Sequence, residues 1–134
     1  LILNRHGHLN AREIARTLMR GGVFFSQQVG SDNLADLAAL FAAAASPGEN
    51  NLAAVSAQLE AEGLVIVRGE TWSGQQTFRD VGALVYFLKA IPWVVPGFSV
   101  KRHETVLARL QERLDAGGAL AFSIRRFLVE AKRP

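Results

Sequence analysis

Polar side chains that follow two apolar runs near the N-terminus are the residues best suited to chemistry in this chain. Asn4, Arg5 and His6 come directly after the first run, and Gln27 and Gln28 lie near the end of the second. Open α/β sheets bind ligands beyond the carboxyl ends of their strands. If both runs are strands of one sheet, these five side chains therefore lie at one ligand-binding edge. His6 is a candidate general base there, and a hydrogen-bonded histidine in a polar loop is the structural alternative.

Gln27 and Gln28 are adjacent in a predicted strand, so their side chains point to opposite faces of the sheet. We expect one of them to orient a substrate and the other to bond to neighbouring backbone. Aromatic residues further along could line a substrate pocket, because such pockets are mostly apolar. These candidates, each with ordinary packing as the alternative, are Trp72, Phe78, Tyr86 and Trp93. Arg79 is a further candidate substrate contact, and Asp80 is expected to cap a helix.

The composition gives little support to metal or thiol chemistry. The chain has no cysteine, which excludes disulfides, thiolate ligands and cysteine nucleophiles. His6 and His8 lie two residues apart, but no acidic residue follows at a ligand spacing. Because a zinc site needs three or four converging ligands, we expect no metal site.

Five basic residues could form a patch for phosphate or RNA: Lys101, Arg102, His103, Arg125 and Arg126. No aromatic side chains are interleaved with them, although stacking on aromatic rings is typical of single-stranded nucleic-acid binding. The net charge is only +3. A solvated start of a helix explains the first three residues, and nucleic acid is not an expected partner.

Length and composition indicate one globular domain over residues 1–134. Hydrophobic residues make up 49% of the chain and charged residues 20%, which suits a folded core and argues against disorder. No apolar run reaches the roughly 20 residues that span a bilayer, and no secretory signal is present. We expect a cytoplasmic protein without a membrane partner.

Residues 1–30 predict a strand, a helix and a second strand. Asn10 is a good N-cap, and Glu13 three residues later completes a capping-box pattern. Gly21 and Gly22 supply the backbone freedom that ends the helix, and Val23–Val29 follows as a strand. Such a short βαβ unit requires parallel strands and a right-handed crossover.

The rest of the chain alternates predicted helices with two further strands. The first predicted helix is capped by Asp32 or Asn33, and its inner face carries Leu34, Leu37, Leu40, Phe41 and Ala44. The other predicted helices are Asn51–Glu62, one that Thr77–Asp80 opens, and Lys101–Ala116. The predicted strands are Leu64–Val67 and Leu120–Ala131, and a change of alternation at Arg125 and Arg126 suggests a bulge. Glu70–Gln76 is predicted as a loop carrying Trp72, and Ile91–Phe98 as a connector broken by proline. This order of elements predicts a layered α/β domain.

Several of these runs resemble class I S-adenosylmethionine-dependent methyltransferases. In that family a helix ending in a pattern like E-x-x-R-V-L-x-P-G-G precedes the fifth strand. The chain departs from the pattern at Thr17 and Arg20 and matches it at Glu13, Arg16, Leu18, Gly21 and Gly22. The runs Gln27–Gly30 and Phe78–Tyr86 are similar to those of one bacterial branch of uncharacterised methyltransferases. The resemblance covers nearly all of the chain.

The resemblance implies a partial Rossmann-like fold, with a mixed sheet of about four strands in the family's order 4-5-7-6. The last strand would run antiparallel between its neighbours. It implies that the cofactor, S-adenosylmethionine, contacts Asn4, Arg5 and His6. A small-molecule methyl acceptor would meet Gln27, Gln28, Trp72, Arg79, Tyr86 and Trp93. Because much of methyl transfer can come from proximity and orientation, no catalytic triad is required.

The family's Gly-rich cofactor loop and the acidic residue after its second strand have no counterpart here. We therefore interpret the chain as the C-terminal half of a methyltransferase domain that begins inside a longer protein, inactive by itself. The strand at Leu1–Asn4 would be an unpaired sheet edge, a feature that proteins avoid. We expect a second copy or the missing half to cover it. The alternatives are a non-catalytic binding or oligomerisation module and a fragment of an RNA methyltransferase.

Overall fold

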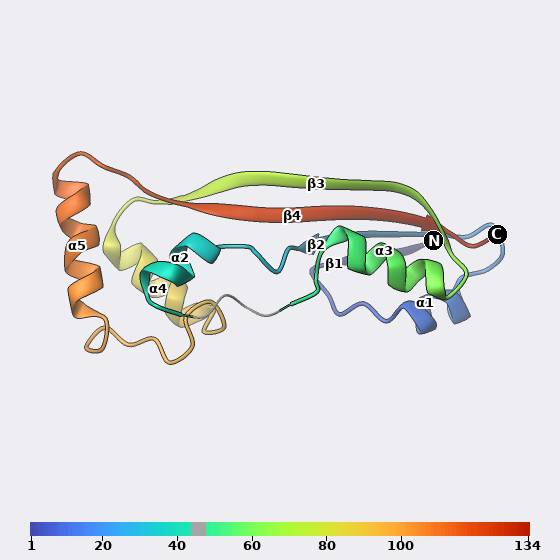
Figure 1. Cartoon of the computed structure of the whole chain (residues 1–134), viewed down its shortest axis with the longest axis horizontal. Coiled ribbons are helices and arrows are strands. Elements are labelled where there is room, and N and C mark those ends of the chain that lie inside the picture. The colour runs from blue at the N-terminus through green and yellow to red at the C-terminus, as the bar shows by residue number, and fades with distance from the viewer. Residues whose placement is uncertain (44–47) are drawn as a thin grey trace. The chain divides into compact units, whose positions relative to one another are not determined.

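A mixed sheet of four strands with flanking helices forms the framework of the chain. The computed structural model describes residues 1–43 and 48–134. Its strands are β1 (Ile2–Arg5), β2 (Val23–Val29), β3 (Val65–Phe78) and β4 (Leu120–Lys132), and its helices are α1 (Ala11–Thr17), α2 (Ala35–Leu40), α3 (Leu52–Ala61), α4 (Val81–Ala90) and α5 (Glu104–Asp115) (Figure 1).

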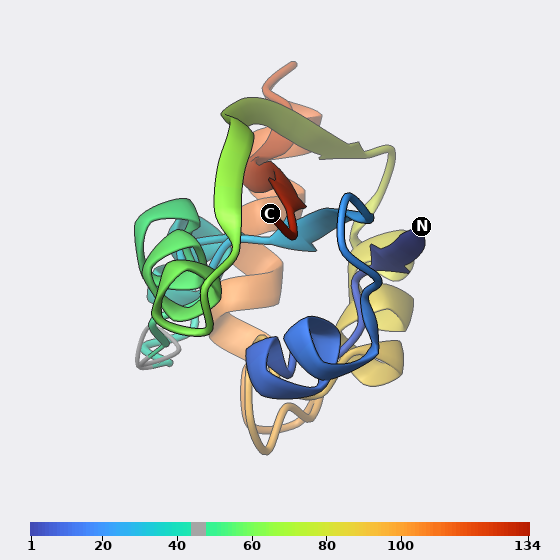
Figure 2. The ribbon, with the colours of Figure 1, turned by 90° about the vertical axis from the view of Figure 1, so that its right-hand side faces the viewer.

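The order of strands in the sheet is β1-β2-β4-β3 (Figure 2). β2 pairs in parallel with β1 and antiparallel with β4. The last strand in sequence therefore lies inside the sheet and runs against β2. This confirms the α/β class and the predicted order 4-5-7-6 with an antiparallel last strand.

The βαβ unit at the N-terminus forms as its sequence predicts. The side-chain oxygen of Asn10 caps α1 by accepting a hydrogen bond from the N–H of Glu13 at 3.1 Å. After the helix, Gly21 has a φ of 74°, and a Cβ at Gly22 would lie 2.7 Å from the carbonyl oxygen of Met19. Only glycine tolerates this combination of backbone angle and close approach. The turn returns the chain to β2 parallel to β1.

The chain divides into two compact units. Unit 1 comprises Leu1–Asn33, Gly48–Ser73 and Arg125–Pro134, and unit 2 comprises Leu34–Pro47 and Gly74–Ile124. β3 and β4 each contribute residues to both units. The expectation of a single domain over residues 1–134 stays a prediction.

In unit 1, α1 and α3 cover one face of the sheet. Phe24 of β2 and Phe127 of β4 are buried in a cluster with Ile14 of α1 and Leu59 of α3. Figure 1 shows both helices on the same side of the strands. The predicted apolar stripe of α1 therefore faces the core, as its helical spacing requires.

The opposite face of this sheet and its β1 edge carry exposed apolar side chains. Leu1 and Leu3 are 81% and 69% exposed, and Val65 of β3 is exposed as well. Ile2, the alternating neighbour of Leu3, packs against the core instead, in keeping with the two-residue period of a strand. β1 is the outermost strand of the sheet within the described residues, as predicted.

Unit 2 has a core of its own, formed by helices α2, α4 and α5 with parts of β3 and β4. Its buried side chains are Leu34, Leu37, Phe41, Phe78, Leu84, Leu88, Val95, Leu107, Leu110, Leu120 and Phe122. Within the part of the chain that the structure describes, no helix has both the length and the apolar character needed to cross a membrane.

The predicted cap of α2 is wrong. Neither Asp32 nor Asn33 caps this helix, because Leu34 occupies the N-cap position with a φ of 59° and makes no side-chain cap bond. Asp32 and Asn33 bond instead to Arg125 of β4. Arg125 lies 92 residues after Asn33 in the sequence. These side chains are suited to capping, but they bond to Arg125 instead of to the start of the helix.

The inner face of α2 is also smaller than predicted. Leu37 and Phe41 are buried, but Leu40 is 45% exposed. The helix ends at Leu40, so the predicted stripe does not continue through a full second turn. Ala44, predicted on the same face, lies outside the described residues.

β3 is much longer than the predicted strand Leu64–Val67. It spans Val65–Phe78 and includes Glu70–Gln76, which was predicted as a loop, so Trp72 is a strand residue. β3 lies at the sheet edge beside β4. Main-chain pairing with β4 stabilises the extended backbone, and an edge strand leaves its polar side chains in water.

α4 begins later than predicted but with the expected cap. Thr77 and Phe78 close β3 instead of opening the helix. Asp80 is the N-cap, and its carboxylate accepts a hydrogen bond from the N–H of Ala83 at 2.7 Å. The side chain that best suits an N-cap therefore sets the start of the helix.

α5 also begins later than the predicted Lys101. It starts at Glu104, and the hydroxyl of Ser99 accepts a hydrogen bond from the N–H of Arg102 at 3.2 Å in the preceding turn. Glu104 rather than a cation therefore occupies the first turn of the helix. The helix dipole favours a negative charge at that position.

The buried positions of β4 change parity between Phe122 and Phe127, as predicted. Phe122 belongs to the core of unit 2, and Phe127 belongs to that of unit 1. From Arg126 to Lys132 the strand pairs with β2 in one continuous register, so the predicted bulge does not interrupt this stretch. The change of parity marks the point where the strand leaves one core for the other.

Candidate functional site

A buried polar network joins the carboxyl ends of β1 and β2. Oδ1 of Asn4 accepts hydrogen bonds from Nε2 of Gln28 at 2.6 Å and from Oγ of Ser26 at 3.2 Å. Nε2 of Gln28 also donates to the carbonyl oxygen of Gly7 at 3.1 Å. Ser26 and Gln28 are both buried, and a buried network with its members paired rigidifies its surroundings. The side chains of Asn4 and Gln28 are thus engaged in fixing the loop after β1.

Arg5, His6 and Gln27 lie together at the rim of the sheet. Arg5 pairs with Gln27 in the β1–β2 register, and the N–H of His6 donates to the carbonyl oxygen of Gln27 at 2.9 Å. Arg5 and Gln27 line a hollow of about 310 Å³ with Leu3 and Phe25. The structure therefore places Arg5 and Gln27 together on the opposite face from Gln28, with the backbone of His6 bonded beside them.

His6 combines an unusual backbone with a lowered pKa. Its φ of 53° lies in the left-handed region, which costs energy for residues other than glycine. Desolvation by burial lowers the pKa of His6 from 6.5, and the positive charges of Arg126 and Arg5 lower it further. The imidazole is therefore neutral at pH 7 and able to accept a hydrogen bond or a proton. A general base needs this protonation state.

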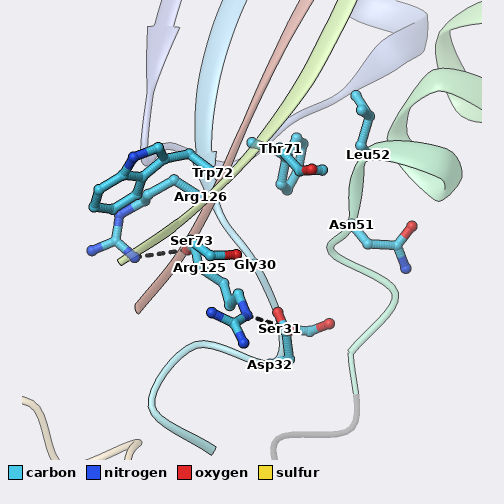
Figure 3. A pocket seen from close by; sticks show the side chains of 11 residues that line it. Gly30, Ser31, Asp32, Asn51, Leu52, Thr71, Trp72, Ser73, Arg125 and Arg126 are labelled. Carbon is cyan, nitrogen blue, oxygen red and sulfur yellow. Dashed lines mark hydrogen bonds and ion pairs between the residues drawn. The ribbon is translucent and has the colours of Figure 1, made fainter. Parts of the chain in front are cut away.

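A second hollow, of about 460 Å³, lies beside the carboxyl end of β2 and wholly within unit 1 (Figure 3). It is lined by Gly30, Ser31, Asp32, Asn51, Leu52, Thr71, Trp72, Ser73, Arg125, Arg126 and Phe127. Figure 3 shows Trp72, Arg125 and Arg126 on one side and Asn51 and Leu52, at the start of α3, on the other. Four separate stretches of the sequence therefore meet at this hollow.

The loop after β2 holds the two arginines in place. Nη1 of Arg126 donates to Oδ1 of Asn33 at 2.6 Å and to the carbonyl oxygen of Arg125 at 2.8 Å. Nε of Arg125 forms an ion pair with Asp32 at 3.4 Å. Burial lowers the pKa of Arg126 below its usual value, yet a guanidinium stays charged at pH 7. The hollow thus contains two positioned cations and one carboxylate.

Gly30 allows this loop to approach β4 closely. Its N–H donates to the carbonyl oxygen of Arg125 at 3.1 Å. A Cβ at Gly30 would lie 2.8 Å from Oδ1 of Asp32 and 3.2 Å from Cβ of Arg125. A side chain here would displace the Asp32 carboxylate from its present position beside Arg125.

Of the predicted substrate residues outside β2, Trp72 lines the second hollow, whereas Arg79, Tyr86 and Trp93 belong to unit 2. Tyr86 and Trp93 are 77% and 71% exposed, and Arg79 is exposed as well. Their roles as substrate contacts stay predictions.

Sequence reasoning missed Ser26 and the use of Asp32 and Asn33. Ser26 and Gln28 occupy the same face of β2 as Phe24, and polar residues alternating on an apolar face signal a buried polar pair that must be bonded. Asp32 and Asn33 carry no such local signal. Their partners in β4 become neighbours only when the sheet forms.

The five residues that could form a basic patch are divided between the units. Residues 101–103 belong to unit 2, and Arg125 and Arg126 belong to unit 1. The ring of His103 stacks on that of Phe98, with centroids 5.3 Å apart and an interplanar angle of 7°. Packing therefore accounts for His103, and a common phosphate or RNA patch stays a hypothesis.

Comparisons with known proteins identify the fold. No protein-family model and no curated protein matches the sequence. Among solved structures, the chain is similar to the YcgJ protein of Bacillus subtilis, with 16% identity and a TM-score of 0.51. It is also similar to the putative methyltransferase BH2331 of Bacillus halodurans, with 11% identity and a TM-score of 0.52.

Each match covers 92% of this chain and 56% of the other chain. The chain therefore spans little more than half the length of the structures that it resembles. At these identities the likeness establishes the fold alone, which is a methyltransferase-like α/β fold. Activity, acceptor and cofactor of the whole protein remain matters for proposal.

The residues at the rim do not form a complete site for S-adenosylmethionine. The amide of Asn4 is turned inward to Gln28 and Ser26. The charged groups nearest His6 are the cations Arg5 and Arg126, which repel a sulphonium centre and suit only the carboxylate end of the cofactor. This chain therefore supplies no more than one edge of such a site.

Proposed function

We propose that this chain is the C-terminal half of an S-adenosylmethionine-dependent methyltransferase, and that its longer parent methylates a small molecule. The observation that carries the proposal is the sheet order β1-β2-β4-β3 with β4 antiparallel. Together with its helices, this arrangement matches the BH2331 structure over 92% of the chain. The resemblance of the run Glu13–Gly22 to the family's helix pattern gives independent support from the sequence.

In this proposal the rim of β1 and β2 faces the reacting groups. Arg5 and Gln27 are side by side in register at this edge, and the network of Asn4, Ser26 and Gln28 keeps the loop after β1 rigid. His6, neutral at pH 7 because its pKa is lowered, accepts a proton from the acceptor. Such positioning supplies most of the rate enhancement that an in-line transfer needs.

The test compares this chain with a chain extended upstream by the residues that its gene encodes. Isothermal titration with S-adenosylmethionine should give saturable binding to the extended chain and none to residues 1–134. Transfer of a labelled methyl group to a panel of small molecules should also occur only with the extended chain. An extended chain that binds no S-adenosylmethionine would refute the proposal.

A substitution at the rim then tests the role of the chain's own residues. In the extended chain, His6→Gln should lower kcat by a much larger factor than it weakens cofactor binding, because glutamine keeps a hydrogen-bonding group but cannot take up a proton. His103→Gln is the matched control, since His103 packs on Phe98 in unit 2. Equal effects of the two variants on kcat would contradict the role of His6.

The exposed β1 edge favours a second candidate function, a module that oligomerises through this strand. Leu1 and Leu3 are among the most exposed large apolar residues of the chain, and an open edge invites pairing with another strand. In this case residues 1–134 should sediment as a dimer, and Leu3→Lys should return them to monomers. A monomer at all concentrations would remove this candidate.

A further inference from the structure

The second hollow of unit 1 has the electrostatic character of an anion site. Arg125 and Arg126 outnumber Asp32, the one carboxylate among its lining residues. Asn51 caps α3 at the opposite wall by accepting from the N–H of Ala54 at 2.9 Å, and the start of a helix adds partial positive charge. An anion entering the hollow therefore meets net positive charge from two sides.

The guanidinium group of Arg126 is held in place before any ligand binds. Because Nη1 of Arg126 is bonded to Asn33 and to the backbone of Arg125, its guanidinium loses little further freedom when a ligand binds. Positioned guanidinium groups recognise carboxylates through paired, charge-assisted hydrogen bonds. Groups that are ordered before binding lower the entropic cost of binding.

Trp72 provides a flat apolar surface beside these cations. It is 55% exposed, although burial of a tryptophan is strongly favourable. Its indole lines the hollow from β3, and a planar ligand would bury it. The volume of about 460 Å³ lies within the range of small-molecule sites, roughly 300–1,000 Å³.

We infer that this hollow binds a small aromatic carboxylate, with the carboxylate against Arg125 and Arg126 and the ring against Trp72. As the methyl acceptor of the parent enzyme, this ligand class rests on the proposed function. The charge of Arg126 lowers the pKa of His6, so the hollow lies within electrostatic reach of the candidate base.

The experiment measures binding on residues 1–134 without S-adenosylmethionine. The chain has two tryptophans, so Trp93→Phe leaves Trp72 as the only indole and makes its fluorescence a reporter of the hollow. We expect benzoate to change this fluorescence in a saturable way. Benzamide, a neutral molecule of the same shape, should bind at least about tenfold more weakly because it lacks the negative charge and the second acceptor oxygen of a carboxylate.

Three variants in the Trp93→Phe background test the assignment. Arg126→Gln should weaken benzoate binding about tenfold or more, and Arg102→Gln in unit 2 should leave it unchanged. Asp32→Asn should strengthen it several-fold, because it removes the carboxylate that competes for Arg125. Because this last variant predicts a gain, the test does not depend on Arg126→Gln remaining folded.

The inference is overturned if benzoate and benzamide bind alike, if no saturable change occurs, or if Asp32→Asn leaves benzoate affinity unchanged or lower. Benzoate binding to this chain combined with no methyl transfer by the extended chain would refute the proposed function alone. Methyl transfer by the extended chain with no carboxylate binding in the hollow would refute this inference alone.

Discussion

The side-chain oxygen of Asn33 lies 2.6 Å from Nη1 of Arg126. This hydrogen bond links the loop after β2 to β4, across 93 residues of sequence. The same oxygen accepts the backbone N–H of Arg125 at 3.0 Å. One amide oxygen therefore fixes two consecutive residues of the strand and sets the position of both cations in the hollow.

Removal of this acceptor should destabilise unit 1. Asn33→Ala leaves a partly buried N–H and a guanidinium without their shared partner, which costs about 1–3 kcal/mol. Asn33→Asp keeps the oxygen in the same place and should lose much less. Urea unfolding of the three proteins measures the difference, and equal losses for the two variants would contradict the role of the oxygen.

Two adjacent glutamines should differ in their contribution to stability. Gln28→Ala removes the buried donor to Asn4 and Gly7 and should lower the free energy of unfolding by about 1–3 kcal/mol. Gln27→Ala, on the opposite face of the same strand, should change it by less than about 0.5 kcal/mol. Denaturant midpoints give both values, and an equal effect would show that the buried network is not stabilising.

Glycine at position 6 should stabilise the fold. His6 has a φ of 53°, and relief of left-handed strain of about 1–2 kcal/mol outweighs the extra freedom that glycine gives the unfolded chain, about 0.4–1 kcal/mol. The midpoint temperature of thermal unfolding should therefore be higher for His6→Gly than for the original chain. His8→Gly, in the same loop but without a positive φ, should shift it downward, and shifts of the same sign would contradict the strain argument.

The pKa of His6 should rise when Arg126 is replaced. Desolvation is the largest cause of the lowered pKa and the charge of Arg126 is the next, so Arg126→Gln should raise it without fully restoring the value of 6.5. NMR titration of the imidazole protons measures the shift, with Arg102→Gln as a control that leaves it unchanged.

Because the pKa of His6 is lowered in the folded chain, the stability of the fold depends on pH near neutrality. The unfolded chain binds a proton to His6 more readily than the folded chain does, so stability falls as pH drops through 6.5 toward the lower folded pKa. Above pH 6.5 the imidazole is neutral in both states and contributes nothing. The free energy of unfolding of the original chain is compared with that of His6→Gln over this pH window. If the original chain gains stability relative to the variant as pH falls, the direction of this pH dependence is contradicted.

Asp36 should give a linkage of the same sign as His6, but at lower pH. Desolvation acts to raise its pKa, but hydrogen bonds from Ser123 and Leu37 outweigh this and hold the pKa below 3.8. The stabilisation that ionised Asp36 provides is present above pH 3.8 and is lost as pH falls through the lower pKa of the folded chain. Asp36→Ala should cost about 1 kcal/mol at pH 7. In urea unfolding, this difference from the original chain should shrink toward pH 2.

The sequence predicted the βαβ unit well, because its signals are local, whereas the sheet order was predicted from the resemblance to the methyltransferase family. Asn10 caps α1 through a residue three positions later, and Gly21 and Gly22 form a turn that other residues cannot adopt. The parity change in β4 between Phe122 and Phe127 is also visible in the sequence, since it reflects burial along one strand. Such features need no knowledge of distant partners.

The extent of β3 and the second hollow could not be predicted in the same way. Glu70–Gln76 has a loop-like composition, and only its pairing beside β4 makes it a strand. Arg125 and Asp32 looked like a surface cation and a helix cap. Their ion pair depends on the register between β2 and β4, which side-chain chemistry alone does not determine.

The rim residues fall between these two cases. Arg5, His6 and Gln27 were placed at one edge by the rule for parallel strands, and the structure has them there. The inward turn of Asn4 was not foreseen, because it depends on Ser26 and Gln28 offering donors on the same face. Side-chain direction at a strand end is decided by such neighbours.

The division of unit 1 into three stretches of sequence has a consequence for synthesis. Its last stretch, Arg125–Pro134, supplies Phe127 and Val129 to the core beneath α1 and α3. Before this stretch is synthesised, β2 lacks its antiparallel neighbour and the apolar faces of both helices are only partly covered. Unit 1 therefore cannot complete its core until this stretch leaves the exit tunnel, and its apolar surface stays exposed to aggregation until then.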